Sequence, residues 1–386
     1  MFSSSECRRA RVRDRPRRHH GHPFGVYGRA REAGPLAVLR MPGAPEWMVV
    51  TRYDDIRAAL TDPRLEIRSE SFMRPDVPDD CLPYMRTMSE MNGAEHARLR
   101  KAAAPAFTPR RAEAFRARIT EIVGRLLDPL DGETDLISAF TRPLPMDVIC
   151  ALVGVPEDDR ERWRAYGRVV DTPGGPGFAA AIPGIMDGAK AAVARRRAEP
   201  GDDLLSDLVT TELTDQELVT LVWHLVLAGQ TPTNLIANAV LALLAHPAQL
   251  AVLRERPGLM PRAVEELTRF CGPTMLSIPR YAHEPMDLCG VEIAGGTPVT
   301  CALVGGNRDP RVFDDPEELD VTRERAPHLG FAHGPHFCVG ASIARVTTQV
   351  ALTELLKRDL ELAADPATLR TPDPGTYRLT ALPVRL

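Results

Sequence analysis

Lysine is almost missing from this sequence of 386 residues. Only Lys101, Lys190 and Lys357 occur, so the other 45 basic residues are arginines. The formal net charge is nevertheless −4, because Asp and Glu together number 52. A chain whose acidic residues outnumber its basic ones offers no electrostatic basis for holding nucleic acid, and we expect no nucleic-acid partner.

The cysteines form no paired motif: neither Cys-x-x-Cys nor His-Glu-x-x-His occurs. There are seven, scattered along the chain: Cys7, Cys81, Cys150, Cys271, Cys289, Cys301 and Cys338. An odd, scattered set fits a reducing cytoplasm better than a disulfide scaffold, so we expect a cytoplasmic protein. The lack of paired ligand clusters also argues against a structural zinc site and against an attached iron–sulfur domain.

We expect neither a secretory signal nor a membrane anchor at the start of the chain. Residues 7–22 are dense in Arg and His and contain no apolar core. We interpret residues 1–22 as a disordered basic tail and residues 23–386 as a single domain. The long apolar stretch at residues 218–245 is interrupted by polar residues and by proline, which is typical of a buried core helix. We therefore expect no membrane partner.

The periodicity of apolar residues predicts a mainly α protein with small β-sheets. Residues 111–213 read as helix after helix, and a capping box at residues 214–217 begins another. The strand candidates are short: residues 47–51, a hairpin within residues 286–303, and parts of residues 362–386.

The most informative stretch spans residues 328–345, His-Leu-Gly-Phe-Ala-His-Gly-Pro-His-Phe-Cys-Val-Gly-Ala-Ser-Ile-Ala-Arg. Gly334 and Pro335 predict a loop, whereas from about Gly340 the apolar spacing predicts a helix. Cys338 therefore lies just before a helix N-terminus. Free amide donors and the helix dipole favour a thiolate there, which is the form that binds a metal. Gly334 and Gly340 also permit close approach by a flat group.

Two simpler interpretations of Cys338 exist. A single cysteine among apolar residues is usually a small buried hydrophobic residue. Three histidines near Cys338 (His328, His333 and His336) could instead form a zinc site with it, although zinc ligands normally come in paired clusters.

The complete loop resembles the haem-binding signature of the cytochrome P450 family, Phe-Gly-x-Gly-x-His-x-Cys-x-Gly-x-x-x-Ala. The matching residues are Phe331, Gly334, His336, Cys338, Gly340 and Ala344. Ala332 replaces the first glycine of the signature, a change small enough to leave the loop intact. The resemblance implies the cytochrome P450 fold and haem b as cofactor, with Cys338 as the axial ligand of the iron and Phe331, His336 and Gly340 in contact with the haem.

Three further residues match the positions of this family that bind the haem propionates. His96 and Arg100 are four residues apart and share one helix face, which suits a pair of carboxylates. The resemblance gives this role to both residues, and to Arg280 in the extended segment Gly272–Ala282. Thr274 to Ile278 would line the pocket beside Arg280.

Residues 228–233, Ala-Gly-Gln-Thr-Pro-Thr, lie in the middle of the expected long helix. Proline cannot bond the carbonyl four residues earlier, so the helix should open there. The segment resembles the oxygen-binding groove of the same family, Ala-Gly-x-(Asp/Glu)-Thr-(Thr/Ser), which implies that Ala228 and Gly229 border the haem. Thr231 replaces the usual acid and Pro232 the usual threonine. Our hypothesis is that Thr231 or Thr233, with water or a substrate hydroxyl, supplies protons.

Other segments match the family in order. Glu266 and Arg269 form its Glu-x-x-Arg pair, and Arg323 fits the second arginine that joins them, a role in fold integrity. The irregular residues 68–92 match a loop over the haem that helps to select substrate. The Gly- and Pro-rich residues 172–177 match a mobile lid, or form a surface loop without a binding role.

The resemblance implies a monooxygenase that activates O2 with two external electrons and hydroxylates or epoxidises a small molecule, in the biosynthesis of specialised metabolites. Ferredoxin and ferredoxin reductase would supply the electrons. One alternative is oxidative coupling of aromatic groups, including those of a peptide substrate, which the unusual Thr231-Pro232-Thr233 sequence favours. Another is a haem-thiolate sensor without turnover.

Overall fold

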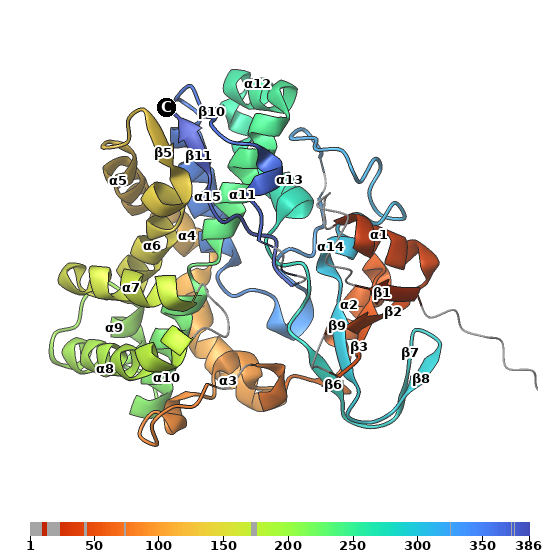
Figure 1. Cartoon of the computed structure of the whole chain (residues 1–386). Coiled ribbons are helices and arrows are strands. Elements are labelled where there is room, and N and C mark those ends of the chain that lie inside the picture. The colour runs from red at the N-terminus through yellow and green to blue at the C-terminus, as the bar shows by residue number, and fades with distance from the viewer. Residues whose placement is uncertain are drawn as a thin grey trace, which may run out of the picture.

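The computed structural model describes residues 10–13, 24–41, 45–72, 75–170, 176–324, 326–371, 373 and 375–386 (Figure 1). Helices dominate these ranges. They are α1 (Phe24–Ala33), α2 (Tyr53–Thr61), α3 (Gly93–Ala103), α4 (Pro109–Ala114), α5 (Arg116–Leu127), α6 (Pro143–Val153), α7 (Arg160–Val170), α8 (Pro176–Ala198), α9 (Leu204–Leu208), α10 (Asp215–Ala228), α11 (Pro232–Ala245), α12 (Pro247–Glu255), α13 (Met260–Cys271), α14 (Leu303–Gly306) and α15 (Ala341–Leu355). The prediction of a mainly α protein is confirmed.

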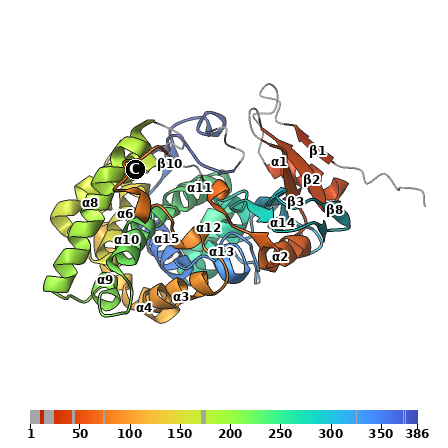
Figure 2. The same ribbon diagram turned by 90° about the horizontal axis from the view of Figure 1, so that it is seen from below.

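The strands form three small sheets. The largest has the order β1 (Ala10–Arg13), β2 (Leu36–Arg40), β3 (Trp47–Val50), β9 (Pro298–Cys301), β6 (Arg280–Ala282) and β4 (Leu65–Glu66). A second sheet joins β10 (Glu361–Leu362), β11 (Pro383–Arg385) and β5 (Glu133–Asp135), and a hairpin joins β7 (Met286–Leu288) to β8 (Val291–Ile293). In Figures 1 and 2 the largest sheet lies at one side of the molecule, away from α5 to α10.

Two strand predictions need correction. The hairpin predicted within residues 286–303 ends at Ile293, because a turn at Gly296, with φ of +81°, sends β9 into the large sheet instead. There β9 pairs in parallel with β3. In the expected disordered tail, residues 10–13 form β1, which pairs in parallel with the edge strand β2. The prediction of disorder is wrong for these four residues, since an exposed strand edge offers free backbone partners. The remaining residues of 1–22 lie outside the described part.

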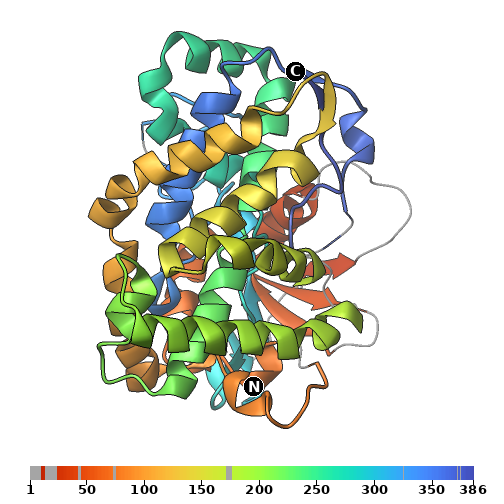
Figure 3. The ribbon, with the colours of Figure 1, turned by 90° about the vertical axis from the view of Figure 1, so that its left-hand side faces the viewer.

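The central helix is divided, as the proline predicted. α10 ends at Ala228 and α11 begins at Pro232, so the opening is a break of three residues, 229–231. α11 lies in the middle of the helical part and packs against α13, α15 and the π-helix η5 (Ile137–Thr141). Figure 3 looks onto the side where α6, α7 and α8 lie, in yellow to yellow-green.

The two irregular segments are described to different extents. Within residues 68–92, of which 73 and 74 lie outside the described part, the structure has three short 3-10 helices: η1 (Ser69–Ser71), η2 (Leu82–Tyr84) and η3 (Met88–Glu90). Of the expected lid, residues 172–177, the first four lie outside the described part, and the last two are the start of α8. Over the described ranges no single helix is long and apolar enough to cross a membrane. By length and composition alone, the α10–α11 segment with α12, bent by 105°, would pass that test.

Candidate active site

The Cys338 loop folds back on itself before α15. The Cys338 N–H donates to the Phe331 carbonyl at 2.9 Å, and the Phe337 N–H donates to the Gly334 carbonyl at 3.0 Å. α15 then starts at Ala341, as predicted, so Cys338 precedes its first turn. These backbone bonds fix the position of the sulfur.

Two residues of this loop have left-handed backbone conformations. Gly334 has φ of +75°, and a Cβ there would lie 2.7 Å from Thr61 Cγ2 and 3.1 Å from the Leu60 carbonyl oxygen. Only glycine fits that position. Ala332, which stands where the family signature has glycine, has φ of +59°. The loop is intact, but Ala332 is strained there.

Replacing Ala332 by glycine should therefore stabilise the protein. Relief of the left-handed strain is expected to exceed the extra entropy of glycine in the unfolded chain, for a net gain of about 1 kcal/mol. The measurement is the urea midpoint of the variant against the wild type. Gly124→Ala is the matched control for a glycine–alanine exchange without positive φ, because Gly124 lies in the middle of α5 and a Cβ there would have no atom within 4 Å. A midpoint for Ala332→Gly at or below that of the wild type would contradict the strain argument.

The surroundings of Cys338 shift the pKa of its thiol in both directions. Burial raises the pKa of the thiol, against a hydrogen bond from the Gly340 N–H and the charges of Arg100 and Arg345, which lower it. The net pKa is raised, so the amide and the two guanidinium groups do not by themselves give the thiolate expected from the helix terminus. A metal ion bound at sulfur would add the missing positive charge, because coordination deprotonates a thiol.

Four basic side chains meet beside the loop. The rings of His96, on α3, and His336 are stacked with centroids 4.1 Å apart. Arg100, one turn after His96, donates from Nη2 to the Phe337 carbonyl at 2.5 Å. Arg280, on β6, is 6% exposed, and its Nε has no hydrogen-bond partner within the described residues. Such a buried, unpartnered donor suits a carboxylate.

Burial and mutual repulsion lower the pKa values of the basic side chains in this cluster. Burial, then the charge of Arg100, lowers the pKa of His96, and burial also lowers that of Arg280. The pKa of His336 falls to about 3 through burial and the charges of His96, Arg280 and Arg100. All of these shifts oppose positive charge, so a ligand with carboxylates would relieve the cluster.

A cavity of about 320 Å³ lies between the Cys338 loop, β6 and the α10–α11 break. Eight of the eleven residues predicted for the site line it: Ala228, Gly229, Thr231, Arg280, Phe331, His336, Cys338 and Gly340. His96 and Arg100 lie behind His336 and Phe337, in contact with the loop. Thr233 does not line the cavity. Of residues 274–278, which the family resemblance placed at the pocket, Thr274, Ser277 and Ile278 line it and Met275 and Leu276 do not.

Thr231 in the break and Thr233 in the first turn of α11 differ in their surroundings. Because Pro232 has no N–H, the Ala228 carbonyl lacks its helical donor, and the Thr231 hydroxyl donates to it at 2.9 Å. Thr231 remains exposed to the cavity. Thr233 is 3% exposed, and its hydroxyl has no partner among the described residues. Gly229 admits no side chain, since a Cβ there would lie 2.6 Å from Ile149 Cγ1.

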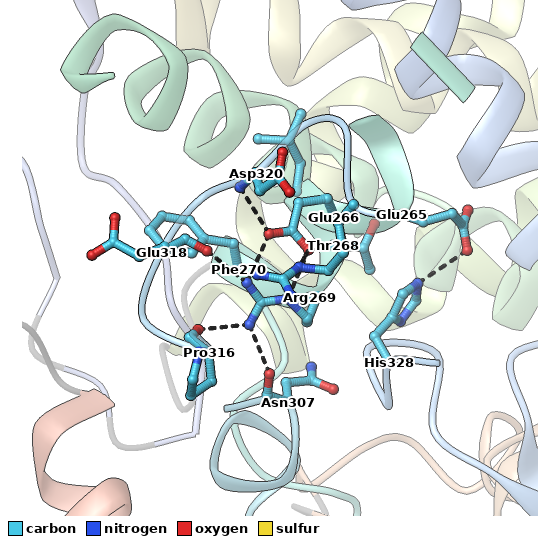
Figure 4. Close-up of polar contacts among 12 residues, drawn as sticks. Glu265, Glu266, Thr268, Arg269, Phe270, Asn307, Pro316, Glu318, Asp320 and His328 are labelled. Atoms are coloured by element: carbon cyan, nitrogen blue, oxygen red, sulfur yellow. Dashed lines mark hydrogen bonds and ion pairs between the residues drawn. The ribbon is translucent and has the colours of Figure 1, made fainter. Parts of the chain in front are cut away.

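The predicted Glu266–Arg269–Arg323 cluster is confirmed, and Figure 4 shows its Glu266–Arg269 part. Arg269 donates to both carboxylate oxygens of Glu266 at 2.7 Å, and Arg323 Nε donates to Oε2 at 3.1 Å. Arg269 also donates to three carbonyls of the segment that leads to the Cys338 loop, those of Asn307, Pro316 and Glu318. The cluster therefore ties α13 to that segment.

Sequence reasoning missed a second cluster, centred on the neighbouring Glu265. Its carboxylate accepts from Arg345 Nε at 2.6 Å and from His328 Nε2 at 3.2 Å. Figure 4 shows the contact with His328. Burial alone would raise the pKa of Glu265, but these partners lower it to about 2. The Arg345 guanidinium lies 4.6 Å from the centre of the Phe331 ring. The only sequence signal was that His328 and Arg345 border the loop.

The arrangement fits a haem. The cavity offers one sulfur, a buried arginine without a partner, and glycines that keep side chains away. Across the described part of the chain, no group of three or more His, Cys, Asp or Glu side chains is placed to hold a metal ion. His328, His333 and His336 thus do not gather with Cys338 as a zinc site would require.

Comparisons with known proteins agree with this geometry. A family model described as cytochrome P450 matches residues 187–368. The cytochrome P450 monooxygenase PikC of Streptomyces venezuelae is 39% identical over 378 residues, which cover 94% of this chain and 91% of PikC. The mycinamicin IV hydroxylase/epoxidase of Micromonospora griseorubida is also 39% identical, covering 86% of this chain and 87% of that enzyme. The solved structure of the Bacillus subtilis bacillaene polyketide synthase cytochrome P450 PksS has a TM-score of 0.87 at 33% identity, covering 95% of this chain and 98% of that one.

Proposed function

Because this chain belongs to the cytochrome P450 family, whose members are monooxygenases with haem b as cofactor, we propose that it inserts one oxygen atom of O2 into a small, largely apolar molecule. When bound, haem b supplies the iron at which O2 is reduced by two electrons. The observation that carries the proposal is the meeting of Cys338, Arg280 and the α10–α11 break at one cavity.

The roles of the residues follow from their positions. Cys338 would bind the iron, while Arg280, His96, Arg100 and His336 would hold the propionates. The break would leave space for O2 between Gly229 and Thr231. The backbone bonds of the Cys338 loop and the contact of Arg100 with the Phe337 carbonyl hold that side of the site in place, so it needs little reorganisation on binding.

The cavity lining indicates the class of substrate. Among the described residues that line it, Arg280 is the one with a permanent charge, and no carboxylate occurs. Much of the lining is aliphatic, for example Ile67, Leu225 and Ile278. Hydroxyl groups are offered by Thr231 and Thr274. A neutral, mainly aliphatic substrate with one or two polar groups suits this lining, and specialised metabolites such as polyketides have this character.

We propose ferredoxin and ferredoxin reductase as the source of electrons, since the chain carries no cysteine cluster for an iron–sulfur centre of its own. The experiment combines the haem-loaded protein, a surrogate ferredoxin system, NAD(P)H and a panel of macrolide-type substrates under ¹⁸O2. A product heavier by one ¹⁸O atom supports the proposal. Loss of two hydrogens without added oxygen would support aromatic coupling instead. No NAD(P)H consumption with any ligand that shifts the haem absorbance spectrum would support a sensor.

Proton supply should depend on Thr231 and not on Thr233. Replacing Thr231 by valine removes the hydroxyl exposed to the cavity, so product formed per NAD(P)H consumed is expected to fall several-fold. Thr233→Val is the matched control, since its hydroxyl is buried away from the cavity. This variant should keep its coupling and gain about 1 kcal/mol of stability, because an unpartnered buried hydroxyl is removed. Equal coupling in both variants would rule out Thr231 as part of the proton path.

A further inference from the structure

Arg345 is held in one position next to the Cys338 loop. Its guanidinium donates to both carboxylate oxygens of Glu265, at 2.6 and 2.9 Å, which ties α15 to α13. The same guanidinium lies 4.6 Å from the centre of the Phe331 ring. The Phe331 carbonyl in turn accepts the Cys338 N–H at 2.9 Å. Because a bidentate pair leaves a guanidinium little freedom, the charge of Arg345 stays beside this part of the loop.

His328 is a second side-chain partner of Glu265. The Gly330 N–H donates to His328 Nδ1 at 3.1 Å, so Nε2 carries the ring proton and donates it to Glu265 at 3.2 Å. The ring is therefore neutral, and its side chain is only 2% exposed. Figure 4 shows how the ring points toward the Glu265 carboxylate. Glu265 and Arg345 are thus an oriented pair of opposite charges, and His328 helps to fix its negative end.

The positive end of this pair acts on the sulfur. The charge of Arg345 is one of the two that lower the pKa of the Cys338 thiol. The Arg345 side chain is 29% exposed, and solvent screens such a partly buried charge less than a charge at the surface. The roles proposed above for the haem propionates, the substrate and the protons do not involve Arg345.

We propose that Arg345 is a positioning residue whose guanidinium, aligned by Glu265 and His328, raises the reduction potential of the iron bound at Cys338. A positive charge beside the sulfur stabilises the state that carries one more electron, so it favours reduction. The first of the two electrons would then enter at a potential that depends on α13 and α15 as well as on the sulfur ligand. This role rests on the proposed function, because it requires haem at Cys338.

The test is the midpoint potential of the haem-loaded protein, measured with chemical mediators and without ferredoxin. Arg345→Gln removes the charge and leaves Glu265 without a charged partner. The ratio of reduced to oxidised protein at a fixed potential is expected to fall about tenfold, a shift of about 59 mV for one electron. Arg345→Lys keeps the charge but loses the planar fork, and should recover most of the wild-type potential. Glu265→Gln removes the opposing charge and should raise the potential.

Arg116→Gln is the matched control. Arg116 also donates to both oxygens of one carboxylate, that of Glu113, at 2.6 and 2.9 Å. It also contacts α15, through Gln349 at 2.8 Å. The control therefore removes an arginine of the same chemistry from the same helix contact, at a place without a link to Phe331. It should keep the wild-type potential.

The spectrum of the reduced protein under carbon monoxide separates two kinds of failure. If the thiolate band is present and Arg345→Gln changes the potential no more than Arg116→Gln, the role of Arg345 is wrong while the proposed function stands. Equal falls in Arg345→Gln and Arg345→Lys would also overturn it, since packing and not charge would then be responsible. If Arg345→Gln does not fold, an unchanged or lower potential in Glu265→Gln would contradict the role. A wild type without the thiolate band would overturn the proposed function and this role with it.

Discussion

Replacement of Arg269 by methionine is expected to lower the free energy of unfolding by about 3–5 kcal/mol, as is usual when one partner of a buried ion pair is removed. The side chains of Arg269 and Glu266 have no exposed surface. Methionine fills much of the volume of arginine but donates no hydrogen bond. Glu266 would retain Arg323 and the Asp320 N–H as its partners, while the carbonyls of Asn307, Pro316 and Glu318 would each lose a donor.

The measurement is the urea midpoint of the haem-loaded protein, followed by circular dichroism. Arg262→Met is the matched control: it lies on the same helix, but its guanidinium is exposed and donates to one carbonyl, that of Thr322, at 3.0 Å. The Arg262→Met substitution should lower the free energy of unfolding by less than about 1 kcal/mol. If Arg269→Met does not fold, Arg269→Lys, which keeps the charge and loses the planar geometry, should give an intermediate loss. Similar midpoints for the Arg262 and Arg269 variants would show that the cluster adds little to stability.

Replacement of Cys338 by serine is expected to abolish the thiolate signature of the reduced protein under carbon monoxide. The wild type should show a strongly red-shifted Soret band, because an anionic sulfur donates electron density to the iron. A serine hydroxyl has neither the acidity nor the softness to replace it. Haem itself should still bind, since His96, Arg100 and Arg280 are unchanged.

Cys289→Ser serves as the control for removing a thiol elsewhere, because Cys289 lies in the turn between β7 and β8. It should keep the wild-type spectrum. A red-shifted band that persists in Cys338→Ser would exclude Cys338 as the ligand. A wild-type band typical of histidine ligation would exclude thiolate ligation altogether.

Sequence could predict those parts of the site that are formed by residues close together in the chain. The Cys338 loop, the opening at Pro232 and the Glu266–Arg269 pair each follow from residue types at fixed spacing. The additional contact to Arg323, across 57 residues, followed from the family resemblance alone and is confirmed at 3.1 Å. Backbone conformation was harder: nothing local reveals that Ala332 has a positive φ, since alanine adopts other conformations more readily.

Side-chain direction at the break could not be predicted. A helical wheel fails where the helix is interrupted, so sequence could not decide between Thr231 and Thr233 or show that Gln230 points toward α7. A Cβ on Gly167 of α7 would lie 2.6 Å from Gln230 Oε1, so that direction depends on a glycine more than 60 positions away. The Glu265 contacts were missed for a related reason, because both partners come from a different part of the chain.

The break between α10 and α11 also prevents the longest apolar segment from forming and melting as one cooperative helix. Its amides are poorly bonded: the Gln230 N–H is 3.5 Å from the Leu227 carbonyl oxygen, the Thr231 N–H is 3.4 Å from that of Ala228, and Pro232 has no N–H. The hydrogen-bond ladder that lets a helix form or melt as one unit is therefore cut. We expect the two halves to act as separate local folding units that meet at the cavity. The wall next to the reacting atoms can thus yield while the helices on both sides stay formed.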